Sequence, residues 1–269
     1  MAMMSADFVA IPGGAFVMGA ADGPHPEDGE GPARPVEIAP YAIAACAVSN
    51  AQFARFVRAT GYVTTAEARG ASHVFFAHLA RPDTHPAPLP EAPWWRDVTG
   101  AQWRYPDGST PAEPDHPVTH VSCADALAYC TWSGTRLPTE AEWECAAAGS
   151  AADQVNIWRG DFPANPVAPP GLWAVGSGVP NGNGLHHACG NVWEWTSDGF
   201  GRLHSPRLAR NPTGNLAARS RVVKGGSYLC SPSYCARFRP SSRRPELPEA
   251  TTGHLGFRVV QGSAQRQPR

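Results

Sequence analysis

The stretch RLPTEAEWE, residues 136–144, has the features of a helix N-terminus. Thr139 offers a capping hydroxyl, and Glu140 and Glu142 fall in the first turn, where carboxylates complement the helix dipole. The pattern predicts a short helix over residues 139–148. This helix start accounts for the glutamates, so they need no catalytic role.

Two more helices are predicted upstream of this one. Over residues 51–60, Phe53, Phe56 and Val57 recur at helical spacing, with capping residues before them and a glycine after them. A similar apolar face predicts a helix over residues 122–132.

The composition leaves little room for further regular structure. The 269 residues include 27 glycines and 28 prolines, which disfavour long helices. Residues 79–117 hold nine prolines, so we expect an extended meander there, anchored by three tryptophans. Short strands are expected at 8–11, 16–19, 36–38, 41–47, 222–224, 227–230 and 257–260.

These elements predict one mixed, loop-rich α+β domain over residues 1–269, with loose ends at 1–7 and 262–269. The net charge of −1 argues against a general nucleic-acid binder, which needs a basic surface. The sequence has no run of about eighteen apolar residues and no secretory signal pattern, so we expect no membrane partner and a cytoplasmic location. In that reducing setting, the seven cysteines are expected to be free, catalytic or metal-bound.

The stretch GGSYLCSPSYC, residues 225–235, carries the most chemistry. Four residues, one of them a proline, separate Cys230 from Cys235, so one tight turn can bring their thiols together. Two thiolates are a suitable ligand set for Cu(I), and metal binding favours the thiolate form. The spacing alone leaves a local disulfide, free thiols and a copper site open.

Motifs along nearly the whole chain resemble the formylglycine-generating enzyme family, also called sulfatase-modifying factors. The cysteine pair inside the Gly-Gly-Ser-Tyr context is the part of the resemblance that points to a catalytic branch. The fold that the resemblance implies is a relative of the C-type lectins. The other matching motifs are IPGGAFVMG (11–19), VSNAQF (48–53), PWW (93–95), AYC (128–130), RLPTEAEWE (136–144), GNVWEWTSD (190–198) and LGFR (255–258).

The resemblance implies a copper-dependent oxidase. One Cu(I) would lie between Cys230 and Cys235, and a cysteine in an unfolded sulfatase segment, Cys-x-Pro-x-Arg, would be oxidised by O2 to Cα-formylglycine. An external reductant is also needed, and the enzyme is expected to be a monomer. By the same resemblance, Ser227 and Trp193 shape the oxygen side of the site, and Tyr234 lines it beside Cys235.

Two further residues are candidate substrate contacts. Arg243 and Tyr228 lie close in sequence to the cysteine pair, and Arg243, with Arg244, either lines a peptide groove or is solvated.

Structural calcium is a second implication of the resemblance. His187 stands where the family usually has Asn or Asp, and the loop 163–175 has no acidic residue, so reduced or absent calcium sites are expected. The residues at calcium-ligand positions are Asn156, Ile157, Gly190, Val192 and Glu194.

Two alternatives stay open. The same copper–thiolate chemistry could act on another peptide or on a small thiol in a biosynthetic pathway. The scaffold could also serve as a non-catalytic binding module, although such relatives generally lack the cysteine pair. An iron-dependent sulfoxide synthase is disfavoured, because the sequence has no His-x3-Glu-x-His stretch.

Overall fold

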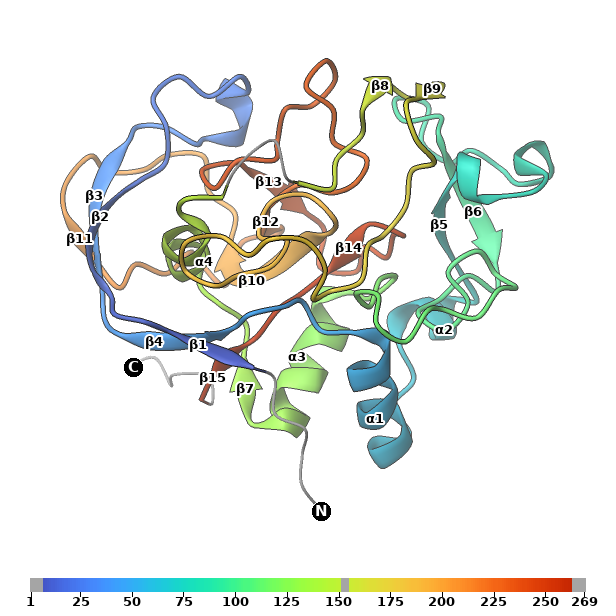
Figure 1. The fold of residues 1–269 in the computed structure, drawn as a ribbon, viewed down its shortest axis with the longest axis horizontal. Helices are drawn as coiled ribbons and strands as arrows, with labels where there is room; N and C mark the ends of the chain where they lie inside the picture. The colour runs from blue at the N-terminus through green and yellow to red at the C-terminus, as the bar shows by residue number, and fades with distance from the viewer. Residues whose placement is uncertain (1–6, 151–154, 263–269) are drawn as a thin grey trace.

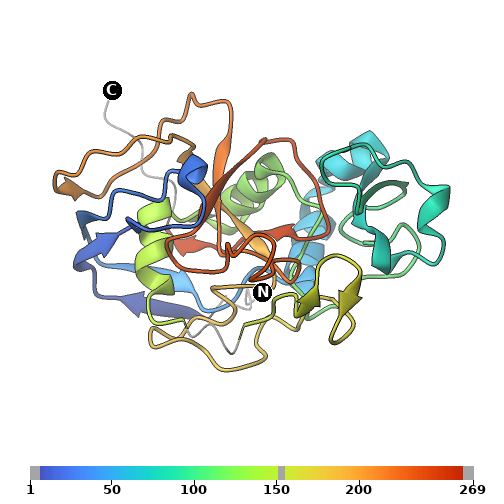
Figure 2. The same ribbon diagram turned by 90° about the horizontal axis from the view of Figure 1, so that it is seen from above.

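The computed structural model describes residues 7–150 and 155–262. It confirms a mixed, loop-rich α+β fold (Figures 1 and 2). The helices are α1 (Asn50–Thr60), α2 (Thr65–Arg69), α3 (Cys123–Ser133) and α4 (Glu140–Ala147), with short 3-10 helices at Pro26–Asp28, Phe76–His78 and Pro82–Thr84. The strands are β1 (Phe8–Ile11), β2 (Gly14–Met18), β3 (Arg34–Ile38), β4 (Tyr41–Ala44), β5 (Ala71–Phe75), β6 (Trp95–Thr99), β7 (Thr135–Arg136), β8 (Gly160–Asp161), β9 (Asn165–Pro166), β10 (Trp193–Gly199), β11 (Ala209–Arg210), β12 (Arg221–Lys224), β13 (Arg243–Glu246), β14 (Leu255–Gly256) and β15 (Val260–Gln261).

The three predicted helices are confirmed as α1, α3 and α4. Each begins with a capping box, in which the N-cap hydroxyl accepts from the third amide and the third side chain accepts from the N-cap amide. The N-caps are Ser49, Ser122 and Thr139. The short helix α2 was not predicted, although Thr64 and Glu67 form the same box before it.

The strands form several small sheets instead of one large one. Two four-stranded sheets have the orders β1-β4-β15-β7 and β13-β12-β10-β14, and a three-stranded sheet has the order β11-β3-β2. β1 and β2 flank one turn but pair with β4 and β3, in different sheets. In Figures 1 and 2, β2 and β3 lie at one end of the molecule, and the β5–β6 hairpin with α2 lies at the opposite end.

Three sequence expectations need correction, and several strands, among them β5, β10 and β13, were not predicted. Residues 227–230 form a turn, and residues 257–259 separate β14 from β15. The region 79–117 is not entirely meander, because it contains β6. β10 was missed because six of its seven residues are buried, which removes the alternation that marks a half-exposed strand.

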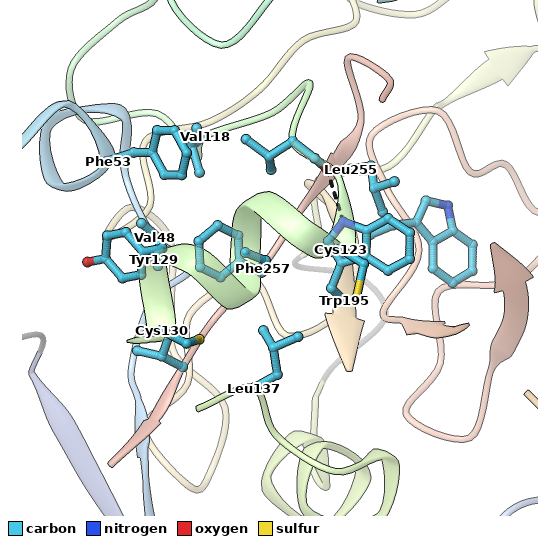
Figure 3. Close-up of a cluster of buried hydrophobic side chains, with 14 of the residues drawn as sticks. Val48, Phe53, Val118, Cys123, Tyr129, Cys130, Leu137, Trp195, Leu255 and Phe257 are labelled. Atoms are coloured by element: carbon cyan, nitrogen blue, oxygen red, sulfur yellow. Dashed lines mark hydrogen bonds between the residues drawn. The ribbon is translucent and has the colours of Figure 1, made fainter. Parts of the chain in front are cut away.

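The largest apolar cluster joins α1, α3 and the β10 sheet (Figure 3). Phe53, on the predicted apolar face of α1, packs edge-on against Phe257, with ring centroids 6.4 Å apart, and Tyr129 of α3 lies 5.4 Å from the same ring. The indole of Trp195 donates to the Val121 carbonyl at 3.0 Å, the dashed line in Figure 3. Both cysteines of the predicted pair belong to this cluster, so the core holds their turn in place.

The expected loose ends fall almost wholly outside the described residues. Asp7, which lies inside them, accepts a backbone hydrogen bond from Ala45 at 2.8 Å. Within the described part of the chain, no helix combines the length and apolar character needed to cross a membrane.

Candidate active site

The segment after β12 folds into two consecutive tight turns that carry the cysteines. The Cys230 amide donates to the Ser227 carbonyl at 2.9 Å, and the Cys235 amide donates to the Ser231 carbonyl at 3.0 Å. Gly226 precedes them with φ of 74°, and a side chain there would collide with the carbonyl oxygen of Arg237. Glycine at position 226 therefore allows the segment after the second cysteine to approach the segment before the first.

The two thiols face one another. Cys230 and Cys235 are free and buried, with 3% and 6% of their surfaces exposed. A hydrogen bond from the Cys230 thiol lowers the pKa of Cys235 to about 6. Burial and this same hydrogen bond raise the pKa of Cys230 well above its ordinary value. The turn thus favours one thiolate and one thiol, which is a pair prepared for a soft metal ion.

Distant segments contact the backbone carbonyls of both cysteines. The Trp158 amide donates to the Cys230 carbonyl at 2.9 Å. The His25 ring Nε2 lies 2.5 Å from the Cys235 carbonyl, within hydrogen-bonding distance. His25 was not predicted as a site residue, because 210 positions separate it from Cys235 and no local pattern reports such a contact.

Ser227 lies on the buried side of the pair. Its Oγ accepts from the Leu229 amide at 3.3 Å and lies 3.2 Å from Nδ1 of His254. Burial and the nearby Arg244 charge lower the pKa of His254 well below its ordinary value, so its ring is neutral near pH 7. His254 was not predicted as a site residue, because it lies in a turn and belongs to no metal-ligand or triad pattern.

Trp193 forms an inner wall of the same region. It is buried at the start of β10, and the guanidinium of Arg244 lies 5.2 Å from its ring centroid. Arg244 is half-buried and also pairs with Glu246, so it is neither fully solvated nor free to contact a substrate alone. The Arg244 guanidinium therefore lies near the cysteine pair, where its charge acts on Cys230 and His254.

Tyr234 forms the exposed side of the site. It is 49% exposed and stacks on Phe162, with ring centroids 4.5 Å apart and an interplanar angle of 13°. Trp94 meets Tyr234 edge-on at 5.2 Å. The neighbouring turn residues Pro232 and Ser233 are also exposed, so this aromatic surface is open to a ligand beside Cys235.

The structure contradicts both candidate substrate contacts. Arg243 is 2% exposed, and its Nε and Nη2 donate to the two carboxylate oxygens of Glu140 at 2.6 and 2.9 Å. Arg243 pairs directly opposite Lys224 in the sheet, and such residues project to the same face, here toward α4. Tyr228 is 1% exposed, and its ring stacks on His78 at 5.5 Å. Neither side chain reaches a substrate.

The expected calcium ligands lie near one another, but they do not offer the expected carboxylate. Asn156 and Gly190 form an isolated β-bridge. Arg258 occupies both carboxylate oxygens of Glu194, at 2.6 and 2.7 Å, and the Trp143 indole donates to one of them at 2.7 Å. In this structure Glu194 is therefore the partner of a buried arginine, and its role as a calcium ligand stays a prediction.

The remaining calcium positions offer no charged group. Ile157 and Val192 are buried apolar residues, and the Asn156 side-chain amide donates to the Gly171 carbonyl at 2.8 Å. His187, which replaces the usual oxygen ligand, has its pKa lowered to about 4 by burial. Across residues 7–150 and 155–262, no group of three or more His, Cys, Asp or Glu side chains is arranged to hold a metal ion.

The fold and this dithiol turn define the class of protein, and comparison with known proteins agrees. The family described as sulfatase-modifying factor enzyme 1-like domain matches residues 2–263. The chain therefore belongs to the sulfatase-modifying factor, or formylglycine-generating enzyme, family.

Individual relatives support the same placement. The formylglycine-generating enzyme of Thermomonospora curvata is 47% identical, over 94% of this chain and 92% of the relative. That of Streptomyces coelicolor is 45% identical, over 94% of this chain and 88% of the relative. Among solved structures, PvdO from Pseudomonas aeruginosa is similar in fold, with a TM-score of 0.69 at 21% identity over 94% of this chain and 93% of PvdO.

Proposed function

We propose that this chain is a copper-dependent oxidase that converts a peptidyl cysteine to Cα-formylglycine. The observation that carries the proposal is the pair of reduced, buried and hydrogen-bonded cysteines, Cys230 and Cys235, on adjacent turns. The relatives named formylglycine-generating enzymes support the reaction.

The residues present suit a Cu(I) ion. The hydrogen bond from the Cys230 thiol lowers the pKa of Cys235, which favours the thiolate form that binds copper. Their surroundings are the apolar cluster that includes Trp193, and such surroundings favour soft thiolate ligands over water. When bound, copper would supply the one-electron chemistry with O2 that the side chains lack.

The chain's own residues position and shield the reactants. Trp193 excludes water from the inner side, and Ser227 presents a hydroxyl whose direction the Leu229 amide and His254 fix. Because His254 is neutral, its ring can accept or donate a hydrogen bond to that hydroxyl without adding charge beside the thiols.

The overall reaction balances with one O2 and an external two-electron reductant. The cysteine Cβ loses one hydrogen and its bond to sulfur and gains a C=O bond, and the second hydrogen stays on the aldehyde carbon while the sulfur leaves as sulfide. One oxygen molecule is reduced to water, with two electrons from the substrate and two from the reductant. The protein supplies no redox group of its own for the second pair.

The substrate class we propose is an unfolded segment of the Cys-x-Pro-x-Arg type. The exposed ring of Tyr234 and the partly buried rings of Trp94 and Phe162 form an aromatic surface beside Cys235, where a proline-containing peptide can pack. A different peptide or a small thiol would use the same dithiol turn without needing this surface.

Two measurements, each repeated on two variants, test the proposal. Anaerobic titration should give one Cu(I) per chain with loss of two free thiols, and mass spectrometry should show aldehyde formation in a Cys-x-Pro-x-Arg peptide after aerobic incubation with a thiol reductant. Cys235→Ser should abolish both, while Cys46→Ser, which changes a cysteine outside the site, should retain both. Full turnover by Cys235→Ser would overturn the assignment, and copper binding with an inert sulfatase peptide would favour another thiol substrate.

A further inference from the structure

A second cavity lies apart from the cysteine turn. It has a volume of about 350 Å³ and lies between the start of α4, the end of β2, the start of β3 and the segment 199–215. None of the proposed catalytic residues lines it. This volume is within the range of small-molecule sites, and exposed lining residues such as Ser205 and Thr213 give it an open side.

Most charges around this cavity already have partners. Arg243 is held by Glu140 and by backbone carbonyls, and Lys224 is held by Glu144 at 2.8 Å with Glu140 at 3.7 Å. Asp198 accepts from two backbone amides, one of them Glu140 at 2.7 Å. The acids on the wall therefore offer little to a cationic ligand.

Arg34 is the exception. Its side chain lines the cavity and is 8% exposed, and among the described residues the nearby carboxylates of Glu140 and Glu144 attract it without forming an ion pair within 4.0 Å. Its contacts are the Pro32 carbonyl at 3.4 Å and the Met18 sulfur at 3.5 Å, both weak. A buried guanidinium stays charged, so an anion bonded directly to its free N–H groups would stabilise it.

Other wall residues fit the body of an organic ligand. The Nε2 atom of His204 is buried without a partner among the described residues, and this side chain lies on the wall near Arg34. Leu203, Ala209 and Pro212 add apolar surface around it. The cavity thus combines an arginine that has no direct hydrogen bond to a carboxylate among the described residues with a short apolar wall.

We propose that this cavity binds a small organic anion whose carboxylate or phosphate is held by Arg34. The planar guanidinium presents paired donors that match either head group. The apolar wall favours a ligand with a short carbon body over a bare inorganic ion.

Isothermal titration and thermal unfolding of the full chain test this site with four probes, namely acetate, succinate, inorganic phosphate and phenyl phosphate, against chloride at equal ionic strength. At least one organic anion should bind and raise the unfolding temperature at about 10 mM. Preference for the carboxylates or for the phosphate ester identifies the head group. If none of the four binds, or if inorganic phosphate alone does, the proposal is overturned.

Matched variants locate the binding. Arg34→Met should weaken it by about tenfold or more, whereas Arg210→Met, which removes an exposed arginine on the same side of the molecule, should not. Ser205→Trp changes an exposed lining residue, so the fold should survive while the indole blocks the cavity. Equal affinity in all three variants would place the ligand elsewhere. None of these experiments measures turnover, so a negative result would overturn the anion site without affecting the proposed oxidase activity.

Discussion

Replacing Arg258 with methionine should destabilise the chain severely, because this arginine is buried and holds a buried carboxylate. Arg258 is fully buried and Glu194 is 1% exposed, and their two hydrogen bonds measure 2.6 and 2.7 Å. The same guanidinium also donates to the carbonyls of Ala44, Ala45 and His186. It therefore joins β4, β10 and the loop before β10 at one point.

The magnitude follows from what the substitution leaves behind. The Glu194 carboxylate would remain buried, with only the Trp143 indole hydrogen bond at 2.7 Å. Removing one partner of a buried ion pair costs about 3–5 kcal/mol, because the other charge is left without compensation. The exposed pair of Arg210 and Glu37, at 2.9 Å, provides the comparison, and breaking it should cost less than about 1 kcal/mol.

Urea unfolding followed by circular dichroism measures both variants against the parent chain. Arg258→Met should lower the free energy of unfolding by about 3–5 kcal/mol, and Arg210→Met by less than about 1 kcal/mol. Adding Glu194→Leu to Arg258→Met should recover part of the loss, because it removes the stranded charge. A loss in Arg258→Met no larger than in Arg210→Met would refute the reasoning and reopen Glu194 as a metal ligand.

Three other predictions test separate regions of the chain. Burial raises the pKa of Asp198 to about 6. The protonated carboxyl therefore stabilises the fold fully below about pH 4, and this stabilisation is lost as the pH rises through 6. In urea unfolding measured across this pH range, Asp198→Asn should remove on the order of 3 kcal/mol of the change in the free energy of unfolding with pH. Phe53→Ala should cost about 3–5 kcal/mol in the same assay, whereas Leu203→Ala, at a position 95% exposed, should change it by less than about 0.5 kcal/mol. In peptide turnover, Tyr234→Ala should raise KM about two- to tenfold through loss of the ring that stacks on Phe162, and an unchanged KM would remove Tyr234 from substrate binding.

Local chemistry explains which elements the sequence could predict. The three predicted helices begin at hydroxyl residues with a complementary side chain three positions later, and that signal is contained within four residues. The same signal at Thr64 and Glu67 could have located α2, but its five residues are too short for an apolar period. β10 stayed hidden because a strand buried on both faces has no alternation to detect.

Among the site residues, too, local contacts could be predicted and tertiary contacts could not. The closeness of Cys230 and Cys235 could be predicted, because one short turn determines it. The direction of Arg243 could not, since it depends on pairing with Lys224 and on packing against α4, 103 residues earlier in the chain. His254 likewise reaches Ser227 only through tertiary contact.

The buried charges beneath the site explain why its turn holds one geometry. Arg243, fixed by Glu140 of α4, donates to the carbonyls of Asp28 and Gly29 and so anchors the turn near residue 28. From that turn, the Asp28 carboxylate holds Arg237 at 2.5 Å, two residues after Cys235. A glutamate that the sequence explains as a helix-start residue therefore acts, through two arginines, on the loop that carries a thiol. If these contacts transmit the effect, substitutions at Glu140 should alter the cysteine turn as well as α4. A glutamate that acted only at the start of its own helix would leave the cysteine turn unchanged.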